Sequence, residues 1–467
     1  MAPLNIVIMA AGKGTRMKSA LPKVLHKLAG RSLLAHVLAS TEALGAARRI
    51  VITGHGAEQV ETAVAGAPAI AFVRQMPQLG TGHAVQQAVP ALEGEEGDKG
   101  ITLVLNGDVP LIRPETAARL VEACAGQRLA LLTIKLADPS GYGRIVRDGE
   151  AVQAIVEHKD ATQEQRRIRE GYTGMMAAPT GALKRWLSQL KNDNAQGEFY
   201  LTDVVAMAVA DGVPVMGIAA PDETEVLGVN SPVQLADLER RFQRQQAIAL
   251  MDGHGVRIAD PARFDVRGTL ECGSDVEIDV NCVFEGTVRL GDGVRIGANC
   301  VIRNADIAAG ARIHEFSHID GEKAGGASVG EGALIGPFAR LRPGARLGAE
   351  VHIGNFVEVK NSTLAKGAKA NHLAYLGDAT VGERVNYGAG SITANYDGAN
   401  KHRTEIGADV HVGSNCVLIA PVTIGAGATI GGGSTITKTV EPGTLAVARG
   451  KQVAISGWMR PVKGTAK

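Results

Sequence analysis

The chain of 467 residues is longer than one ordinary hydrophobic core, so two or three domains are expected. Hydrophobic residues make up 45% of the sequence and aromatic residues only 3%, which favours a core of Val, Ile and Leu. The formal net charge of +1 gives no reason to expect a nucleic acid or an anionic membrane as a partner. The N-terminus lacks a basic segment followed by a long apolar one, so no signal peptide or membrane span is predicted. The five cysteines form no C-x-x-C pair, and a cytoplasmic location is expected.

A glycine-containing loop follows the first predicted strand. Leu4–Met9 is a short apolar run typical of a buried parallel strand, and it leads into Ala10–Met17, AAGKGTRM. Glycines here let backbone N–H groups face a phosphate, while Lys13 and Arg16 add positive charge. The loop has neither the third glycine of a dinucleotide fingerprint nor the Gly-Lys-Ser/Thr of a Walker loop. Taken alone it fits a tight structural turn equally well, although Lys23 offers a further cation within reach.

Strand-like and helical segments alternate over the next hundred residues. The strands are predicted at Ile50–Thr53, Ala69–Val73 and Thr102–Asn106, and the helices at Leu33–Leu44 and Gln59–Ala65. This alternation favours a doubly wound, Rossmann-like α/β domain, whose ligands bind at the carboxyl ends of the strands. Asp108 follows one of these strands, so it is either a ligand for Mg²⁺ or an ordinary turn aspartate.

The motifs A-A-G-x-G-T-R-M and L-P-K resemble those of the sugar-1-phosphate nucleotidyltransferases. The resemblance implies that Arg16 and Lys23 are catalytic and that Asp108 and Asn230 hold Mg²⁺. It assigns UTP and UDP-sugar binding to Ala10, Ala11, Gly12, Lys23, Gln75, Gly80, Thr81, Gly143, Glu157, Tyr172 and Asn230. Tyr172 departs from the Asn usual in the family, and Asn106 stands where members often have Tyr. The implied reaction is an in-line attack of a sugar phosphate on the α-phosphorus of UTP, which needs positioning and charge neutralisation but no general base.

One long helix is predicted from Ser231 to Gly253. Ser231 suits the N-cap, Pro232 the first turn, and Gly253 the end of the helix. Its apolar stripe lies between charged faces that contain acidic residues, so a linker is favoured over a membrane-surface helix. The predicted organisation is therefore a domain at 1–230 that resembles the nucleotidyltransferases, a linker helix at 231–253 and a further domain at 254–467.

In the C-terminal half a branched aliphatic residue recurs every sixth position. The most regular stretch contains Val329, Ile335, Leu341, Leu347, Ile353 and Val359; a later one contains Ile406, Val412, Leu418, Ile424, Ile430 and Ile436; an earlier, rougher one contains Ile278, Phe284, Leu290, Ile296 and Ile302. A period of six fits neither a helix nor a long flat strand. It predicts a solenoid of three-sided coils, whereas a glycine-rich sandwich would carry the period only by accident. The pattern resembles the hexapeptide-repeat, left-handed parallel β-helix family, and the hand is implied by that resemblance.

Two segments, Ala365–Ala379 and Gly388–Lys401, are expected to interrupt the repeat as projecting loops. They combine Lys, His, Asn and Tyr, which regular repeats rarely do. Loops on a rigid solenoid are natural places for function. These segments therefore favour a second catalytic site over a β-helix that serves only for assembly.

Four motifs, at 342–344, 355–360, 372–378 and 395–398, resemble the bifunctional bacterial N-acetylglucosamine-1-phosphate uridyltransferase/glucosamine-1-phosphate N-acetyltransferase family over the whole chain. The resemblance implies that His372 is the general base for acetyl transfer, a role that suits histidine. It assigns the sugar phosphate to Arg342, Lys360, Tyr375, Asn386 and Lys401. It assigns acetyl-CoA to Ala389, Asn395, Tyr396, Ser414 and Arg449. Glu358 either orients a partner in the pocket or simply pairs with the neighbouring cations.

The same resemblance implies a homotrimer whose acetyl-transfer sites are shared between neighbouring chains. Glucosamine-1-phosphate would be acetylated by acetyl-CoA first, and N-acetylglucosamine-1-phosphate would then react with UTP to give UDP-N-acetylglucosamine. Two alternatives remain at this point: a nucleotidyltransferase with one activity, and a non-enzymatic regulatory subunit built on the same folds. Arg342, Lys360, His372 and Tyr375 argue against the first, and the intact Gly12–Arg16 loop with Lys23 and Asp108 argues against the second.

Overall fold

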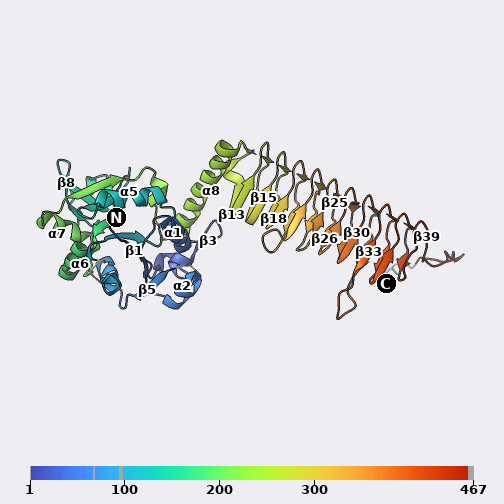
Figure 1. Ribbon diagram of the computed structural model, residues 1–467, viewed down its shortest axis with the longest axis horizontal. Coiled ribbons are helices and arrows are strands. Elements are labelled where there is room, and N and C mark those ends of the chain that lie inside the picture. Colours follow the sequence, from blue (N-terminus) through green and yellow to red (C-terminus); the bar gives the residue numbers. More distant parts are fainter. Residues whose placement is uncertain (1, 67–68, 94–97, 461–467) are drawn as a thin grey trace, which may run out of the picture. The chain divides into compact units, whose positions relative to one another are not determined.

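The computed structural model describes residues 2–66, 69–93 and 98–460, and the chain divides into two compact units. The first unit runs from Met1 to Phe242 and the second from Gln243 to Lys467 (Figure 1). Within the described ranges, no helix is both long and apolar enough to cross a membrane.

The first unit is built around a mixed nine-stranded sheet. Its order is β11-β7-β10-β6-β1-β4-β5, with the β8–β9 hairpin paired to β10. The strands are β1 (Leu4–Met9), β4 (Arg48–Thr53), β5 (Ile70–Arg74), β6 (Ile101–Asn106), β7 (Leu129–Lys135), β8 (Gly143–Asp148), β9 (Ala151–Val156), β10 (Glu170–Pro179) and β11 (Val215–Ala219). The neighbours β5, β4, β1 and β6 are parallel, whereas β10 runs antiparallel between β6 and β7. The short apolar runs predicted as strands are central because both of their faces are buried.

Helices cover both faces of this sheet. They are α1 (Leu33–Glu42), α2 (Ala57–Val64), α3 (Thr81–Ala88), α5 (Pro114–Cys124), α6 (Thr180–Gln189) and α7 (Val204–Ala210). Ile6 and Ile8 on β1 point into a core with α1, α2 and α5, whereas Val7 points into a second core with α3, α6 and α7. The predicted doubly wound α/β fold is therefore confirmed, with one antiparallel strand added.

The long helix α8 (Pro232–His254) contributes residues to both units. Ser231 is its N-cap, as predicted, because the Gln234 N–H donates to the Ser231 hydroxyl at 3.2 Å. The helix ends at His254, one residue beyond the predicted stop. In the first unit Leu238 packs with Met17, Leu28, Leu33 and Val229.

In the second unit, Gln243 closes the end of the first coil. Its side chain is fully buried, its Nε2 donates to the Val266 carbonyl (2.9 Å) and its Oε1 accepts from the Val266 N–H (2.8 Å). The side-chain amide of Gln243 thus makes the two hydrogen bonds that a neighbouring strand would make to the backbone of Val266.

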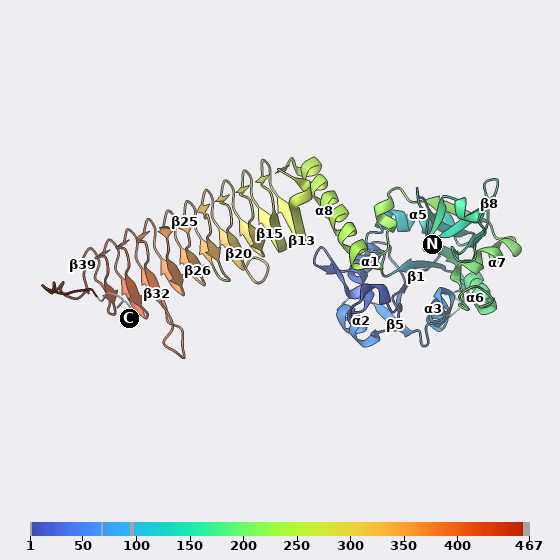
Figure 2. The same ribbon diagram turned by 180° about the vertical axis from the view of Figure 1, so that it is seen from behind.

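The second unit is a parallel β-helix whose strands stack in chain order (Figures 1 and 2). One sheet consists of β12 (Arg257–Ile258), β14 (Glu277–Ile278), β16 (Arg295–Ile296), β19 (Arg312–Ile313), β22 (Leu334–Ile335), β25 (His352–Asn355), β28 (Lys369–His372), β31 (Asn386–Tyr387), β34 (His411–Val412), β37 (Thr429–Ile430) and β39 (Leu445–Ala446). The other consists of β13 (Phe264–Cys272), β15 (Cys282–Leu290), β17 (Val301–Arg303), β18 (Ala305–Ile307), β20 (His318–Asp320), β21 (Ala327–Val329), β23 (Arg340–Leu341), β24 (Arg346–Leu347), β26 (Glu358–Lys360), β27 (Thr363–Leu364), β29 (Tyr375–Gly377), β30 (Ala379–Val381), β32 (Ile392–Ala394), β33 (Thr404–Ile406), β35 (Val417–Ile419), β36 (Val422–Ile424) and β38 (Thr435–Ile436).

The period of six marks the inward side chains of this β-helix. Every aliphatic of the three predicted series is at most 5% exposed and belongs to one continuous core. The hexapeptide-repeat prediction is therefore confirmed. All five cysteines are free thiols, and four of them are buried.

One of the two expected interruptions is wrong. The segment Ala365–Ala379 continues the coils through β28 and β29, because Ala370 and Leu376 keep the inward positions while His372 and Tyr375 point outward. The second segment does project: after β32 the chain leaves the coil and returns at β33, closed by an antiparallel bridge between Tyr396 and Lys401. This loop is visible beside β33 in Figure 1.

Candidate functional sites

The first candidate site lies where Lys23 meets two side chains from distant parts of the first unit. Its Nζ donates to Asp108 Oδ2 at 2.5 Å and to Asn230 Oδ1 at 3.0 Å. Asp108 follows β6, and the Val229 N–H donates to the Asp108 carbonyl, which brings the segment containing Asn230 alongside. Three residues predicted to act together are thus in contact, and two side-chain oxygens converge on one cation.

Two hollows adjoin this contact. The Asp108 hollow, of about 240 Å³, is lined by Arg16, Asp108 and Asn230 among others, and the Glu157 hollow, of about 220 Å³, by Gly143, Glu157 and Tyr172 among others. Both are also lined by Asn106, Gly141, Tyr142 and Thr173, so the two hollows lie side by side, and together they are called the cleft below. The cleft lies at the carboxyl end of β6, where ligands bind in open α/β sheets.

Glycines keep the backbone close to this cleft. Gly14 has φ of 59°, and a Cβ on it would lie 2.7 Å from Lys23 Cβ, so only glycine lets Lys23 lie against the loop. A Cβ on Gly12 would meet nothing within 4 Å, which leaves its backbone open to a ligand. A Cβ on Gly143 would lie 2.8 Å from Ile155. Ala10 and Ala11 are buried beside the loop.

The predicted nucleotide residues Gln75, Gly80 and Thr81 form a separate group that supports a second loop. Gln75 is 3% exposed, and its amide donates to the Gly80 carbonyl at 2.9 Å. The Thr81 hydroxyl accepts from the Leu201 N–H at 3.1 Å. Thr81 also lines the Glu157 hollow, whereas Gln75 and Gly80 line neither hollow.

Glu157 is a half-buried residue that lines its hollow. Burial raises the pKa of its carboxyl group, although the Thr202 hydroxyl, which donates to Oε1 at 3.1 Å, acts in the opposite direction. Thr202 was missed from the sequence, as was Gln234, which lines the Asp108 hollow and accepts from the Asn230 N–H at 2.8 Å. Neither residue belongs to a recognisable motif, so only their contacts reveal them.

The second candidate site is on the β-helix and begins with a basic cluster of Arg342, Lys360 and Lys401. Lys401 lies close enough to lower the pKa of the Lys360 ammonium, and Arg342 and burial act in the same direction. Three adjacent cations repel one another, and a bound phosphate would offset this repulsion by pairing with them. The cluster therefore suits a phosphorylated ligand.

Tyr375 and Glu358 adjoin the basic cluster. Gly377 pairs with Lys360 between adjacent coils, and a Cβ on Gly377 would overlap the Tyr375 phenol, so that ring extends toward the cluster. Glu358 Oε1 accepts from Arg342 at 2.8 Å, and its other oxygen accepts from Arg340 at 3.2 Å. These contacts fit the reading of Glu358 as a salt-bridge partner of the arginines.

His372 lies at the end of β28, on the edge between the two sheets. The ring is exposed, and its Nδ1 lies 3.1 Å from Asn355 Oδ1. If Nδ1 carries the hydrogen and donates it to Asn355, Nε2 is left as a proton acceptor. Asn386 lies on β31 of the first sheet, whereas Tyr375 lies on β29 of the other. The sugar-phosphate residues predicted from the sequence therefore occupy two different faces of one chain.

The positions predicted to bind acetyl-CoA fall into two groups. Ala389 and Ser414 stack above His372 in successive coils, and Arg449 donates to the carbonyl of Gly432, the next member of this column, at 2.9 Å. These small residues leave a smooth strip between the histidine and the guanidinium. Asn395 and Tyr396 instead belong to the projecting loop.

The two loop residues differ in their exposure. Asn395 is 8% exposed and its amide donates to Asp378, which fixes the base of the loop. Tyr396 is 62% exposed, so its ring is available to a ligand.

An exposed apolar ladder follows the corner next to His372. It consists of Phe316, Phe338, Phe356 and Leu373, which are 46–63% exposed and occupy equivalent positions in four successive coils. The rings of Phe316 and Phe338 stack with centroids 5.0 Å apart, and those of Phe338 and Phe356 at 5.3 Å. All four residues have φ between 50° and 59°, which is rare for bulky side chains. Such a stripe is typical of an interaction surface.

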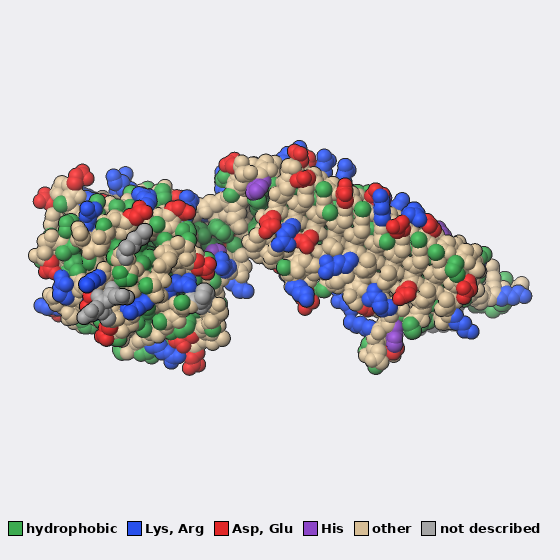
Figure 3. Space-filling model, viewed as in Figure 1, with side chains coloured by type: hydrophobic (Ala, Val, Ile, Leu, Met, Phe, Trp, Pro, Cys, Tyr) green, Lys and Arg blue, Asp and Glu red, His purple; other side chains and the backbone are tan. Residues whose placement is uncertain are grey.

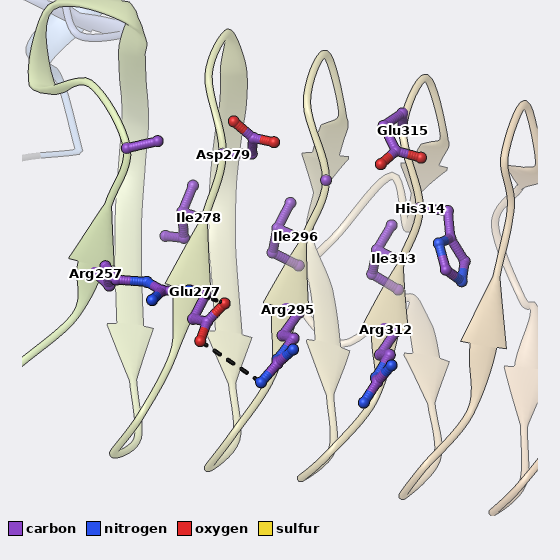
Figure 4. Close-up of a pocket in the computed structure, with 12 residues that line it drawn as sticks. Arg257, Glu277, Ile278, Asp279, Arg295, Ile296, Arg312, Ile313, His314 and Glu315 are labelled. Carbon is purple, nitrogen blue, oxygen red and sulfur yellow. Dashed lines mark ion pairs between the residues drawn. The ribbon is translucent and has the colours of Figure 1, made fainter.

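A further hollow, of about 470 Å³, lies on the first coils of the β-helix, where its lining reaches His314 and Glu315, next to Phe316 (Figure 4). Arg257, Glu277, Arg295 and Arg312 occupy equivalent positions on four successive strands there, and Glu277 forms ion pairs with the arginines on either side of it. On the face shown in Figure 3, acidic and basic side chains likewise lie intermingled. The described residues contain no group of three or more His, Cys, Asp or Glu side chains suited to a metal ion.

Comparisons with known proteins identify the family of each of the two units. The model of the MobA-like NTP transferase domain matches residues 6–191, and that of the bacterial transferase hexapeptide (six repeats) matches residues 271–304, 326–361 and 403–438. The bifunctional protein GlmU of Methylibium petroleiphilum is 75% identical over 467 residues, covering 98% of this chain and 99% of that protein. Those of Polaromonas naphthalenivorans and Polaromonas sp. are 69% and 68% identical, each covering 99% of this chain and 98% of the relative. The chain therefore belongs to the family of bifunctional GlmU proteins, enzymes that join a nucleotidyltransferase and a hexapeptide-repeat transferase.

Proposed function

We propose that the chain acetylates glucosamine-1-phosphate with acetyl-CoA in its β-helix and then transfers a uridylyl group from UTP to N-acetylglucosamine-1-phosphate in its α/β unit. The convergence of Asp108 and Asn230 on the Lys23 ammonium is the observation that carries the second reaction. The basic cluster, together with His372, carries the first. The products are UDP-N-acetylglucosamine, pyrophosphate and free CoA.

In uridylyl transfer, an oxygen of the sugar phosphate attacks the α-phosphorus of UTP and the bond to the leaving pyrophosphate breaks. The nucleophile is already anionic, so the chain has to position the reactants and neutralise charge. Arg16, from the wall of the Asp108 hollow, and Lys23 supply positive charge to the phosphates. The open backbone at Gly12 lies against the nucleotide, and the sugar occupies the Glu157 hollow.

Asp108 and Asn230 fit a magnesium ion. Their oxygens both face one cation, the Lys23 ammonium, so the pair presents two oxygen donors at a single point. Mg²⁺ prefers oxygen ligands and usually takes only one or two from the protein, with substrate phosphates completing its coordination. When bound, it would supply charge neutralisation to the phosphates.

In acetyl transfer, the basic cluster holds the sugar phosphate and His372 removes a proton from the 2-ammonium group. The freed amine attacks the thioester carbonyl carbon, and CoA leaves as the thiol. Asn355 holds the ring through Nδ1, so Nε2 receives the proton. Asn386 completes the sugar site, the strip of Ala389 and Ser414 lies along the CoA arm, and Arg449 suits its phosphates.

A homotrimer accounts for two features of the β-helix. The side chains of Lys360 and Asn386 lie on different sheets, so one chain does not present both to the same small ligand. A neighbouring copy that covers the exposed apolar ladder would bring its own face next to the edge that carries His372. Closed symmetric assembly of identical chains is common among soluble oligomers. Each acetyl-transfer site is then completed by residues from adjacent subunits.

The two reactions are tested by following two products in the same samples. Free thiol is measured with glucosamine-1-phosphate and acetyl-CoA, and pyrophosphate with UTP and N-acetylglucosamine-1-phosphate. We expect His372→Ala to lose thiol release by about 100-fold or more and to keep pyrophosphate release. The matched control His318→Ala, an exposed histidine elsewhere on the β-helix, should keep both. If the wild-type protein releases pyrophosphate but no thiol, the proposed acetyl transfer is wrong and the β-helix serves only for assembly.

The shared site is tested by mixing two inactive variants. Lys360→Ala and Asn386→Ala are unfolded together and refolded as mixed assemblies. If the two residues of a site come from different chains, about a quarter of the sites in an equal mixture regain both residues, and thiol release returns. Phe338→Asp should reduce the mass measured by light scattering from three chains to one. Recovery that stays at the level of the separate variants would contradict the shared site.

A further inference from the structure

Asp378 is a buried acidic residue at the corner of the coil between β29 and β30. Its side chain is 5% exposed, and its backbone has φ of 51°. Burying a carboxylate is costly unless its oxygens are hydrogen-bonded or paired with a charge. The groups that stabilise this carboxylate therefore indicate its role.

Two amide side chains bind the two oxygens of the Asp378 carboxylate. Asn361 Nδ2 donates to Asp378 Oδ1 at 2.5 Å, and Asn395 Nδ2 donates to Asp378 Oδ2. A carboxylate only accepts hydrogen bonds, so both amides present their NH2 groups to it. Hydrogen bonds to an ionised group are roughly twice as strong as those between neutral groups. The carboxylate is thus satisfied by neutral donors, and it forms no ion pair with any of the described residues.

Asp378 also holds both ends of the projecting loop. Asn395 is the first residue after β32, and its side chain is bound by the Asp378 carboxylate. Thr404 begins β33, where the chain re-enters the coil, and its N–H donates to the Asp378 carbonyl at 3.2 Å. One residue of the preceding coil therefore fixes where the loop leaves the β-helix and where it returns. Between these two points the loop carries Tyr396 and Lys401.

The charge of Asp378 acts on the basic cluster, where like charges lie together. Lys401 lowers the pKa of the Lys360 ammonium, and burial and Arg342 act in the same direction. The charge of Asp378 acts in the opposite direction. A carboxylate that paired directly with Lys360 would compete with a phosphate for the ammonium. Asp378 instead offsets the repulsion between the cations without occupying them, because its oxygens are already bound by amides.

We propose that Asp378 is a positioning residue for acetyl transfer: its carboxylate holds the projecting loop on the coil, so that Lys401 lies beside Lys360, and its charge offsets the repulsion between them. The proposal rests on the function proposed above and adds how the free protein keeps the basic cluster assembled before a phosphate binds. Asp378 is buried and does not need to touch either substrate. Its effect should thus appear in the binding of both substrates rather than in the acetyl-transfer step, because His372 lies on β28, outside the loop.

Asn395→Asp tests the proposal because it places a second carboxylate opposite Asp378 and should detach the loop. The KM values for glucosamine-1-phosphate and acetyl-CoA should each rise about tenfold, as expected for one lost charge-assisted hydrogen bond. The kcat should stay within about threefold and pyrophosphate release should not change. Adding Asp378→Asn restores one carboxylate that faces one amide, so each KM should fall again by at least about threefold.

Asp275→Asn is the matched control for these variants. Asp275 lies between β13 and β14 of the same β-helix, and it is an exposed aspartate with a similar left-handed backbone, φ of 54°. It contacts neither the projecting loop nor the basic cluster. Both KM values of acetyl transfer should therefore equal those of the wild type.

The pH dependence of the KM for glucosamine-1-phosphate tests the role of the charge. Asp378→Asn keeps the shape of the side chain and, because the Asn395 amide can turn to present its oxygen, keeps both hydrogen bonds. Without the negative charge, the Lys360 ammonium loses its proton at a lower pH. The rise of this KM at alkaline pH should therefore begin about half a pH unit or more below that of the wild type. Titration of the amine and phosphate of the substrate is common to both proteins and cancels in the comparison.

Three results would count against these ideas. A double variant with KM values no lower than those of Asn395→Asp alone would overturn the anchoring of the loop by Asp378. An unchanged pH dependence for Asp378→Asn would overturn the role of its charge, and this measurement does not require Asn395→Asp to fold. Absence of thiol release from the wild type would instead overturn the proposed function itself.

Discussion

Lys23 occupies the position where two predicted metal ligands converge, so its ammonium and a divalent cation compete for the same oxygens. The Nζ contacts Asp108 at 2.5 Å and Asn230 at 3.0 Å. We expect Lys23→Ala to bind Mn²⁺, a paramagnetic substitute for Mg²⁺, more tightly than the wild type in the absence of nucleotide. Uridylyl transfer should nevertheless fall by about 100-fold or more, because the same ammonium neutralises the phosphates during reaction.

The size of the change follows from the geometry. Two unit charges 4 Å apart interact by about 1 kcal/mol in water and about 4 kcal/mol at an effective dielectric constant of 20. The Lys23 and Asp108 side chains are 15% and 18% exposed, so the pair lies between these limits. In the wild type, the flexible Lys23 side chain can turn away from an incoming metal ion and so avoid most of the charge repulsion. The remaining cost of metal binding is the loss of the ion pair between Lys23 and Asp108. A gain of about 1.5–3 kcal/mol, or about ten- to hundredfold in the Kd of Mn²⁺, is expected.

Electron paramagnetic resonance of free Mn²⁺ measures this Kd without any turnover. Lys13→Ala, in the neighbouring Ala10–Met17 loop, is the matched control and should bind Mn²⁺ like the wild type. Adding Asp108→Asn to Lys23→Ala should abolish the gain in Mn²⁺ affinity, which would show that the ion binds at Asp108. Equal Kd values for Lys23→Ala, Lys13→Ala and wild type would refute the competition between lysine and metal.

Three further changes give distinct results. Burial raises the pKa of Glu157 above its ordinary value of 4.5, so its ionised form destabilises the fold as pH rises through this range. Glu157→Gln should therefore unfold at higher urea than the wild type at neutral pH, and the advantage should vanish below about pH 4. Gly377→Ala displaces the Tyr375 phenol, so thiol release should fall at least about tenfold with pyrophosphate release intact. Asp397 accepts hydrogen bonds from Ala399, Asn400 and His402 within the projecting loop, so Asp397→Ala should raise the KM for acetyl-CoA several-fold while the melting temperature stays constant.

The β-helix was predictable because one physical requirement repeats along the chain. Every side of a coil must bury one aliphatic, so Val359, Ile406 and their equivalents mark the coils without knowledge of their contacts. The same reasoning failed at Ala365–Ala379, where polar outward residues suggested a loop although Ala370 and Leu376 keep the inward positions. A coil tolerates any residue on its outer surface, so polarity there carries no information about the path of the backbone.

The sites were predictable where chemistry is concentrated in short motifs, and less so elsewhere. Asp108 was suggested because it follows a predicted strand, and Lys23 because it adds a cation near the glycine-containing loop. Asn230 came from a family resemblance alone, since nothing in the local sequence marks an asparagine 122 positions after Asp108 as a partner of these residues. Thr202 and Gln234 act through single hydrogen bonds to Glu157 and to the Asn230 backbone, and such bonds leave no pattern. The apolar ladder was missed because left-handed backbone at a phenylalanine depends on the stacking of whole coils.

The amide of Gln243 also covers part of the outer edge of the first coil. A coil with a free edge offers its N–H and C=O groups to any other strand, so an uncovered end is a template for joining chains end to end. By occupying the N–H and C=O of Val266, the Gln243 side chain removes two of the groups that the outer edge of β13 would otherwise offer. Gln243→Leu would keep the bulk but expose a complementary edge, turning a terminus into a seed for linear polymers. At the start of the repeats, the Gln243 amide therefore also protects the edge of the β-helix against end-to-end association with other chains.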